Sequence, residues 1–291
     1  GAVAFTDYTR RTQSVNVDRH SGKETLSLGE GQQDRNTFAG LTARGTLQYR
    51  LSQKMSLQPG YDINTESGEG GRLKPGAHAI NDYAVFASAE YMPSAHVSLR
   101  PGIRVIRNSQ YETPPLIYSI NTKFRLTNKS DLRLSYGRGF RAPALRELYF
   151  YFFDASHSIE GNPDLDPEHS HNLNASVNWF PVKNKKVILR NTLSSFYNKI
   201  DDMITMGYLP GGNTVTTYLN VSKYKSAGVV LTGMLAWNNT EITAGFSFTG
   251  RYNELEQDNS SLPEFMWSPE ANTSLSYTFP KAGLTTNAYL K

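Results

Sequence analysis

The sequence predicts an all-β protein, an antiparallel up-and-down transmembrane β-barrel that is a fragment of a larger barrel. Three observations lead to this fold class. Apolar and polar residues alternate with a period of two in about a dozen segments, short and long connections alternate between them, and no segment approaches the ~20 consecutive apolar residues of a membrane-spanning helix. The mean hydropathy of −0.49 agrees with a barrel, because half of each strand faces a polar lumen.

The first predicted strands cover residues 41–51, 55–63 and 83–91, and each separates apolar from polar side chains. In the third strand, Tyr83 and Tyr91 end an apolar row that includes Val85, opposite Ser88 and Glu90. Amphipathic rings at both ends of an apolar row are typical of the two membrane interfaces. The apolar rows of the first two strands are Leu41, Ala43, Leu47, Tyr49 and Leu51, and then Met55, Leu57, Tyr61 and Ile63.

The same alternation predicts the later strands in order. Their apolar rows are Val97, Leu99, Ile103 and Val105; Tyr118, Ile120, Phe124 and Leu126; Leu132, Leu134 and Tyr136; Leu173, Ala175, Val177 and Trp179; Val229, Leu231, Leu235 and Trp237; and Leu275, Tyr277 and Phe279. We expect these rows to face outward, and the intervening polar residues to face the lumen.

Connections of two lengths separate the strands. We expect tight antiparallel hairpins after Leu51, Met92, Leu126, Phe180, Trp237 and Phe279. Long connections cover residues 9–36, 65–79, 138–167, 206–214 and 253–263. Short turns on one side and long loops on the other are typical of outer-membrane barrels, with periplasmic turns and extracellular loops.

The longest predicted connection carries two sequence boxes. Residues 137–149 read GRGFRAPALRELY, residues 161–168 read GNPDLDPE, and residues 220–229 read NVSKYKSAGV. The first two resemble the FRAP-like and NPDL-like boxes that the TonB-dependent receptors of the Gram-negative outer membrane carry on one extracellular loop. The third stretch resembles the start of the long strand that follows in that family.

The resemblance implies a ligand-gated active transporter in the cell outer membrane, with no enzymatic activity and no intrinsic cofactor. Its cargo would be a scarce metal complex, such as haem iron, an iron–siderophore or a corrinoid. The implied partners are the receptor's own plug domain, the TonB–ExbB–ExbD complex of the inner membrane, lipopolysaccharide or other lipid, and a small-molecule metal chelate. Nucleic acid is not expected as a partner, because the sequence has no contiguous basic patch outside the barrel.

Residues 1–291 are expected to form only part of such a barrel. Plugged outer-membrane transporters have about 22 strands, against about a dozen here. The plug domain, the first strands and the closing C-terminal strands are therefore expected to be absent from this sequence.

The loop between residues 140 and 168 is the predicted ligand-binding site, because its aromatic residues suit a flat apolar ligand. In the haem-receptor branch of the family a histidine lies between the two boxes, which makes His157 a candidate axial haem ligand. A solvated histidine is the alternative, and the ligand would then be a siderophore or corrinoid held by Tyr149, Tyr151 and Phe153. The predicted ligand-binding residues are Phe140, Arg141, Tyr149, Tyr151, Phe153, His157, Asn162 and Asp164.

The end of this loop has a second interpretation. Carboxylates and histidines at Asp164, Asp166, Glu168, His169 and His171 could bind a hard cation. Asn-Pro and Asp-Pro pairs favour turns, however, so we prefer a scaffold that returns the loop to the barrel. A short helix is expected within residues 142–149, beginning at Pro143.

The charged residues predicted to face the lumen allow two interpretations. The net charge is +4, and five basic residues are predicted to face the lumen: Arg100, Arg104, Lys123, Arg125 and Arg133. They either pair with carboxylates of a plug or are simply hydrated lumen residues. The chain has no cysteine, which excludes a disulfide or a thiolate metal site within it.

Two other functions share the barrel. An outer-membrane barrel enzyme of the protease or lipase kind would need a nucleophile beside a base, and Ser170 lies between His169 and His171. Adjacent residues of a strand point to opposite faces, so neither histidine would reach that serine. A binding-only adhesin would not explain the two receptor-like boxes.

Overall fold

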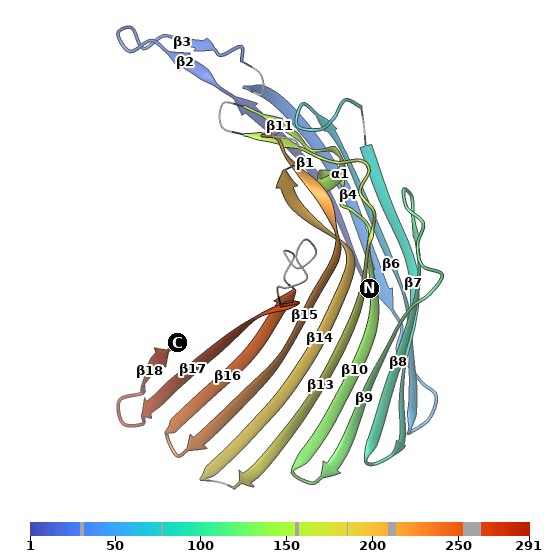
Figure 1. The fold of residues 1–291 in the computed structure, drawn as a ribbon, viewed down its shortest axis with the longest axis vertical. Helices are drawn as coiled ribbons and strands as arrows, with labels where there is room; N and C mark the ends of the chain where they lie inside the picture. Colours follow the sequence, from blue (N-terminus) through green and yellow to red (C-terminus); the bar gives the residue numbers. More distant parts are fainter. Residues whose placement is uncertain (30–31, 77, 155–156, 185, 209–213, 253–262) are drawn as a thin grey trace.

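The computed structural model describes residues 1–29, 32–76, 78–154, 157–184, 186–208, 214–252 and 263–291. Thirteen strands pair antiparallel in one sheet, in the order β1-β4-β6-β7-β8-β9-β10-β13-β14-β15-β16-β17-β18. Figure 1 shows this sheet as a curved wall with β1 and β18 at its two edges. The predicted up-and-down order is confirmed, and in the described residues the two edge strands do not pair to close the wall.

The strands of the wall are long, and the helix is short. The wall strands are β1 (Ala2–Gln13), β4 (Gln33–Thr46), β6 (Met55–Gly70), β7 (His78–Ser94), β8 (Val97–Asn108), β9 (Ile117–Thr127), β10 (Ser130–Arg141), β13 (Glu168–Lys183), β14 (Val187–Tyr208), β15 (Thr216–Trp237), β16 (Thr240–Tyr252), β17 (Phe265–Phe279) and β18 (Leu284–Leu290). The smaller elements are β2 (Val15–Val17), β3 (Glu24–Leu26), β5 (Tyr49–Arg50), α1 (Leu145–Tyr149), β11 (Tyr151–Phe153) and β12 (Ser158–Glu160).

All six predicted hairpins are present, and they lie together at what we call the short-turn end of the wall. The turn between β15 and β16 illustrates the sequence requirement. Trp237 pairs with Thr240 across a two-residue loop, and Asn238 there has a φ of 51°. Two-residue hairpins need this left-handed conformation, which asparagine tolerates better than most residues.

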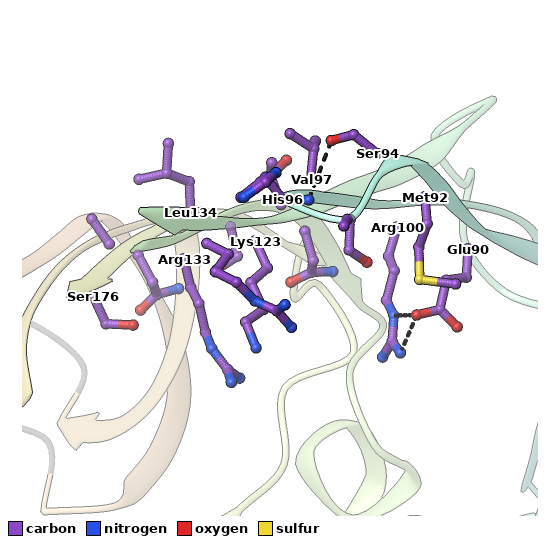
Figure 2. Close-up of a pocket in the computed structure, with 18 residues that line it drawn as sticks. Glu90, Met92, Ser94, His96, Val97, Arg100, Lys123, Arg133, Leu134 and Ser176 are labelled. Carbon is purple, nitrogen blue, oxygen red and sulfur yellow. Dashed lines mark hydrogen bonds and ion pairs between the residues drawn. The ribbon is translucent and has the colours of Figure 1, made fainter. Parts of the chain in front are cut away.

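The two faces of the wall have the predicted chemistry. The outward apolar side chains remain exposed to solvent in the isolated chain; Val85, for example, is 62% exposed. Figure 2 shows Leu134 and Val97 on one side of the sheet, with Arg100, Lys123 and Arg133 on the other. Arg104 also faces the lumen, where its guanidinium lies 3.2 Å from Asp62. The predicted outward positions are confirmed for Tyr83, Leu99, Tyr118, Leu173, Val229 and Leu275.

Several strands extend farther than the sequence predicted. Both β14 and β15 have 22 residues, and β1 and β4 reach into the predicted 9–36 loop, which also contains the β2–β3 hairpin. Backbone pairing continues beyond the part of the strand that faces the membrane. Only that part needs an apolar outer face, so the alternation in the sequence ends before the strand does. The predicted connection at residues 253–263 lies almost wholly outside the described residues.

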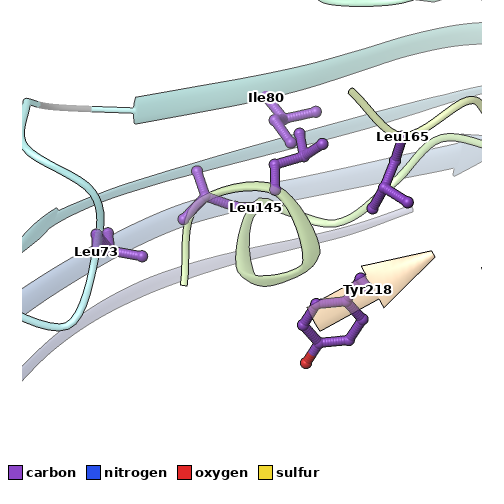
Figure 3. Close-up of a cluster of buried hydrophobic side chains, with 6 residues drawn as sticks. Leu73, Ile80, Leu145, Leu165 and Tyr218 are labelled. Atoms are coloured by element: carbon purple, nitrogen blue, oxygen red, sulfur yellow. The ribbon is translucent and has the colours of Figure 1, made fainter. Parts of the chain in front are cut away.

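The largest buried cluster joins the longest described loop to the lumen face. It contains Leu73, Ile80, Leu145, Leu148, Leu165 and Tyr218, which come from the wall, from the connection after β6, from α1 and from the loop's return (Figure 3). Each of these side chains is at most 7% exposed. The 142–167 loop therefore packs against the inside of the wall at its long-loop end. Within the described residues, no helix combines the length and apolar character needed to cross a membrane.

Candidate functional site

Arg141 fastens both ends of the 142–167 loop. It is the last residue of β10, and its Nε and Nη2 donate to the two carboxylate oxygens of Glu168 at 2.9 and 2.5 Å. Its Nη1 donates to Glu147 Oε2 of α1 at 2.8 Å. Glu168 also accepts a hydrogen bond from the Ile204 backbone N–H at 2.8 Å. One guanidinium thus connects the strand before the loop, the helix within it and the strand after it.

Helix α1 is present but begins later than expected. Its N-cap is Ala144, so Pro143 precedes the helix and does not occupy its first turn, which corrects the predicted start. Ala144 has no side-chain acceptor, and the Glu147 carboxylate instead accepts the Ala144 backbone N–H at 2.7 Å. Leu145 and Leu148 are each 1% exposed, and this burial holds a helix too short to be stable alone.

The NPDL-like box returns the loop to β15. Asn162 Nδ2 donates to the Tyr218 carbonyl at 3.0 Å, and the Asp166 backbone N–H donates to Asn220 Oδ1 at 2.8 Å. At Gly161 a side chain would lie 2.7 Å from the backbone of Leu148, so only glycine fits. In the described part of the chain, no three His, Cys, Asp or Glu side chains are grouped to hold a metal ion. These contacts favour the scaffold interpretation of the box.

His157 is held in a defined orientation. Its Nδ1 lies 2.9 Å from Asp154 Oδ1, and its backbone N–H donates to the same oxygen at 2.8 Å. The imidazole stacks on Phe152 with centroids 4.7 Å apart, and the Arg72 guanidinium lies 3.6 Å from the centroid of that phenyl ring. The His157 side chain is nevertheless 51% exposed, so an oriented imidazole is accessible to a ligand.

The other predicted aromatic residues divide into two groups. Tyr151 and Phe153 lie side by side on β11, with centroids 4.5 Å apart. Tyr149 instead stacks on His78 of β7 at 3.8 Å and packs against the buried cluster. Phe140 contacts His169 on the outer face of the wall, away from His157. The β11–β12 hairpin therefore carries Tyr151 and Phe153 on one face and His157, stacked on Phe152, on the other.

Tyr111, in the connection between β8 and β9, packs against the buried cluster. Burial raises the pKa of its hydroxyl to about 12, and the neighbouring Tyr149, Asp166 and Glu147 add to the shift. The phenol is therefore neutral at physiological pH.

The sequence did not single out the 71–77 connection, which supplies partners to the loop. Arg72 is 8% exposed and donates to Asp34 Oδ2 at 3.0 Å, and Lys74 forms an ion pair with Glu160 at 2.9 Å. The sequence placed these residues in a long connection, residues 65–79, without giving either of them a role. Their partners are distant in sequence, so no local pattern could identify them.

A second polar region lies lower in the lumen, near the short-turn end. Arg100, Lys123, Arg125 and Arg133 line a groove of about 820 Å³ (Figure 2). Arg100 pairs with Glu90 at 2.7 Å and Arg133 with Asp131 at 3.0 Å. In the residues that the structure describes, Lys123 and Arg125 form no ion pair. This basic wall therefore offers positive charge to whatever occupies the lumen.

The serine of the enzyme alternative has no adjacent base on its own strand. Ser170 contacts Gly139 on the lumen face. His171 lies on the outer face, where its Nδ1 is hydrogen-bonded to the Tyr136 hydroxyl at 2.8 Å. His169 contacts Phe140 on that same outer face. The expected opposite facing of these three residues is confirmed.

An up-and-down β-wall with an apolar outer face, a polar inner face and a loop packed inside defines a membrane β-barrel protein. Sequence comparison gives the family. The chain belongs to the TonB-dependent receptors, because the family described as TonB dependent receptor-like, beta-barrel matches residues 2–290. The sequence is also similar to hemoglobin and hemoglobin-haptoglobin-binding protein C of Haemophilus influenzae, at 30% identity over 93 residues, which are 32% of this chain and 8% of that protein.

Solved structures of low sequence identity share the fold. The copper transporter OprC matches with a TM-score of 0.64 and 16% identity, over 94% of this chain and 46% of that one. The hemophore receptor HasR of Serratia marcescens, in complex with its hemophore HasA and heme, matches with a TM-score of 0.64 and 14% identity, over 88% and 51%. The chain thus spans about half the length of the solved structures that it resembles.

Proposed function

We propose that this chain belongs to the barrel of a Gram-negative outer-membrane receptor that takes up haem through TonB-dependent transport. The observation that carries the choice of ligand is the oriented His157 on the aromatic β11–β12 hairpin. Haem, a flat macrocycle around a central iron, would take an imidazole as an axial ligand of the metal and aromatic surface against its faces. His157 provides the first, and Phe152, on which it stacks, is the aromatic ring beside it; Tyr151 and Phe153 add aromatic surface on the other face of the same hairpin.

The contact between His157 and Asp154 supports a ligand role. The Nδ1 atom is engaged by a carboxylate oxygen at 2.9 Å, which favours the tautomer whose Nε2 lone pair can bind iron. A carboxylate behind a histidine ligand also raises the basicity of the imidazole. The relatives support the same ligand class, since one is named for haemoglobin binding and one was solved with heme.

The rest of the transport system is part of this proposal. A plug domain would fill the lumen, the TonB–ExbB–ExbD complex would supply the driving force, and the loops of the long-loop end would face the cell exterior. The basic wall formed by Arg100, Lys123, Arg125 and Arg133 would then meet carboxylates of the plug.

A second candidate ligand is an iron–siderophore or a corrinoid. The paired rings of Tyr151 and Phe153 favour it, because they offer an aromatic surface without requiring a metal ligand from the protein. Binding would then depend on these two residues and on Tyr149, and His157 would be dispensable.

The substitution His157→Ala in the full-length receptor tests the choice. We expect it to abolish the Soret shift on haem titration, while His171→Ala, on the outer face, leaves the shift unchanged. Asp154→Asn should weaken haem binding by about 10- to 100-fold, because it removes the carboxylate behind the imidazole. An unchanged haem titration in His157→Ala would contradict the haem assignment and favour the second candidate.

A further inference from the structure

A buried ion pair is connected to the exposed imidazole of His157 through one phenyl ring. Arg72 Nε donates to Asp34 Oδ2 at 3.0 Å, and these two side chains are only 10% and 4% exposed. The buried Asn36 completes the arrangement. Its Nδ2 donates to the same Asp34 oxygen at 2.7 Å, and its Oδ1 accepts the Arg72 backbone N–H at 2.8 Å. Both the backbone and the guanidinium of Arg72 are therefore fixed to β4.

The connection after β6, which contains Arg72, also holds the hairpin that carries the imidazole. The Tyr151 backbone N–H donates to the Arg72 carbonyl at 2.9 Å, and the Lys74 backbone N–H donates to the Tyr149 carbonyl at 2.7 Å. These main-chain hydrogen bonds do not depend on the side chain of Arg72. They fix the hairpin as a whole, so the guanidinium is left for a different task.

Phe152 links Arg72 to His157. The guanidinium carbon lies 3.6 Å from the centroid of the phenyl ring, and the imidazole stacks on the same ring at 4.7 Å with an interplanar angle of 19°. Asp154 Oδ1 engages His157 Nδ1 at 2.9 Å, but one hydrogen bond to a ring nitrogen leaves the tilt of the imidazole plane unrestrained. Stacking on a ring that is itself held by a cation restrains that tilt.

The burial of the ion pair indicates a role in geometry. Burying two charges costs free energy that their attraction only roughly offsets, so a buried pair is weak evidence for stability. A guanidinium does provide direction, because it is planar, presents its donors in a rigid fork and stacks on aromatic faces. Here Asp34 engages the donors of Arg72 and Phe152 meets its guanidinium.

We propose that Arg72 is a positioning residue for the ligand-binding imidazole and acts through Phe152. Asp34 fixes the guanidinium, the guanidinium fixes the phenyl ring, and the ring sets the plane of His157. This role rests on the proposed haem function and deepens it, because it adds a residue that orients the iron ligand without touching the haem. Partners behind a metal ligand tune both the affinity for the metal and its electronic state.

The test is a double-mutant cycle in the full-length receptor, titrated with ferric haem in detergent. Arg72→Lys keeps a charge for Asp34 but removes the planar group, so we expect haem binding to weaken by about 5- to 30-fold. The low-spin EPR signal of the bound haem should broaden, because the imidazole plane is no longer fixed. Phe152→Leu should have the same two effects. The double variant should lose no more than either single variant, since both break the same chain of contacts.

The matched control is Arg104→Lys. Arg104 also pairs with an aspartate, Asp62, at 3.2 Å and lies 5.9 Å from the centroid of a phenyl ring, that of Phe86. These residues belong to the wall and not to the hairpin or to the connection after β6. Arg104→Lys should therefore leave both the haem titration and the EPR signal unchanged.

Hydrogen exchange separates positioning from folding. Exchange in residues 149–153 should be unchanged in Arg72→Lys, because the main-chain hydrogen bonds to the hairpin remain. Faster exchange there, wild-type haem binding in Arg72→Lys, or additive losses in the double variant would each overturn the positioning role. Such results would leave the haem function standing as long as His157→Ala abolishes the Soret shift. Normal haem binding by His157→Ala would overturn both.

Discussion

Arg141 is the residue on which the position of the ligand loop depends most. Its three donors are used by Glu168 and Glu147, whose side chains are only 15% and 18% exposed. We expect Arg141→Ala to leave two half-buried carboxylates without their cation and to destabilise the closed loop by about 1–3 kcal/mol. Hydrogen exchange of peptides from residues 142–168 should accelerate by about 5- to 150-fold in the full-length protein.

The control for this change is Arg133→Ala. Arg133 lies on the same strand, but its side chain is 58% exposed and pairs with Asp131 two residues away. Its removal should leave exchange in the loop unchanged. If both substitutions had the same effect on the loop, or if neither had any, the fastening role of Arg141 would be wrong.

At the scale of single residues, the sequence indicated which side chains belong to the candidate site better than it indicated which side chains contact one another. It placed His157 on an aromatic loop, but it assigned Arg141 to the ligand without indicating the two carboxylates that engage it. The contact between Arg72 and Phe152 was not predictable either, since 80 positions separate the two residues along the chain. Such pairings depend on how distant segments meet inside the wall, and local patterns carry no information about that.

The strand is the element that meets the membrane, and its two faces should respond differently to charge. Val85 of β7 lies in the outward apolar row, whereas Ser88 of the same strand faces the lumen. We expect Val85→Arg to lower the free energy of unfolding in bilayers by roughly 2–4 kcal/mol, because it places a charge near the middle of the lipid. Ser88→Arg should cost much less. Denaturant titration of the full-length receptor in vesicles measures both.

Leu231 of β15 is a second outward position at which the same effect can be tested. It pairs with Leu193 and Phe246, which belong to the outward apolar rows of the neighbouring strands. Leu231→Arg should destabilise the barrel as much as Val85→Arg does. Equal effects at Val85 and Ser88 would mean that the register of β7 is displaced by one residue, since such a displacement exchanges the two faces.

The alternation predicted the strands well where lipid imposes it and poorly elsewhere. Residues 83–91 were assigned correctly because their outward side chains must be apolar, whereas the continuation of β14 to Tyr208 has no such requirement. The short turns were also predictable, since two to four polar residues between apolar rows allow few alternatives. Helix α1 was expected, but its start shifted because Glu147 caps the backbone at Ala144.

On the scale of the whole molecule, the wall is taller than a membrane is thick. The 22 residues of β14 and β15 extend for about 70 Å at ~3.3 Å per residue, whereas crossing the bilayer takes about 10 residues. The excess lies toward the long-loop end, where the β2–β3 hairpin projects from the wall (Figure 1). The two ends of the wall should therefore differ completely in their exposure on intact cells.

Cysteine labelling measures this orientation without background from this chain, which has no cysteine of its own. His20 lies in the exposed turn of the β2–β3 hairpin, where Asp18 Oδ1 accepts its backbone N–H at 2.9 Å, so His20→Cys should preserve the turn. Asn239 lies exposed in the turn between β15 and β16, at the opposite end. In cells expressing the full-length receptor, a membrane-impermeant maleimide should label His20→Cys directly and Asn239→Cys only after the outer membrane is permeabilised. Labelling of Asn239→Cys alone in intact cells would contradict the assignment of the short-turn end to the periplasm.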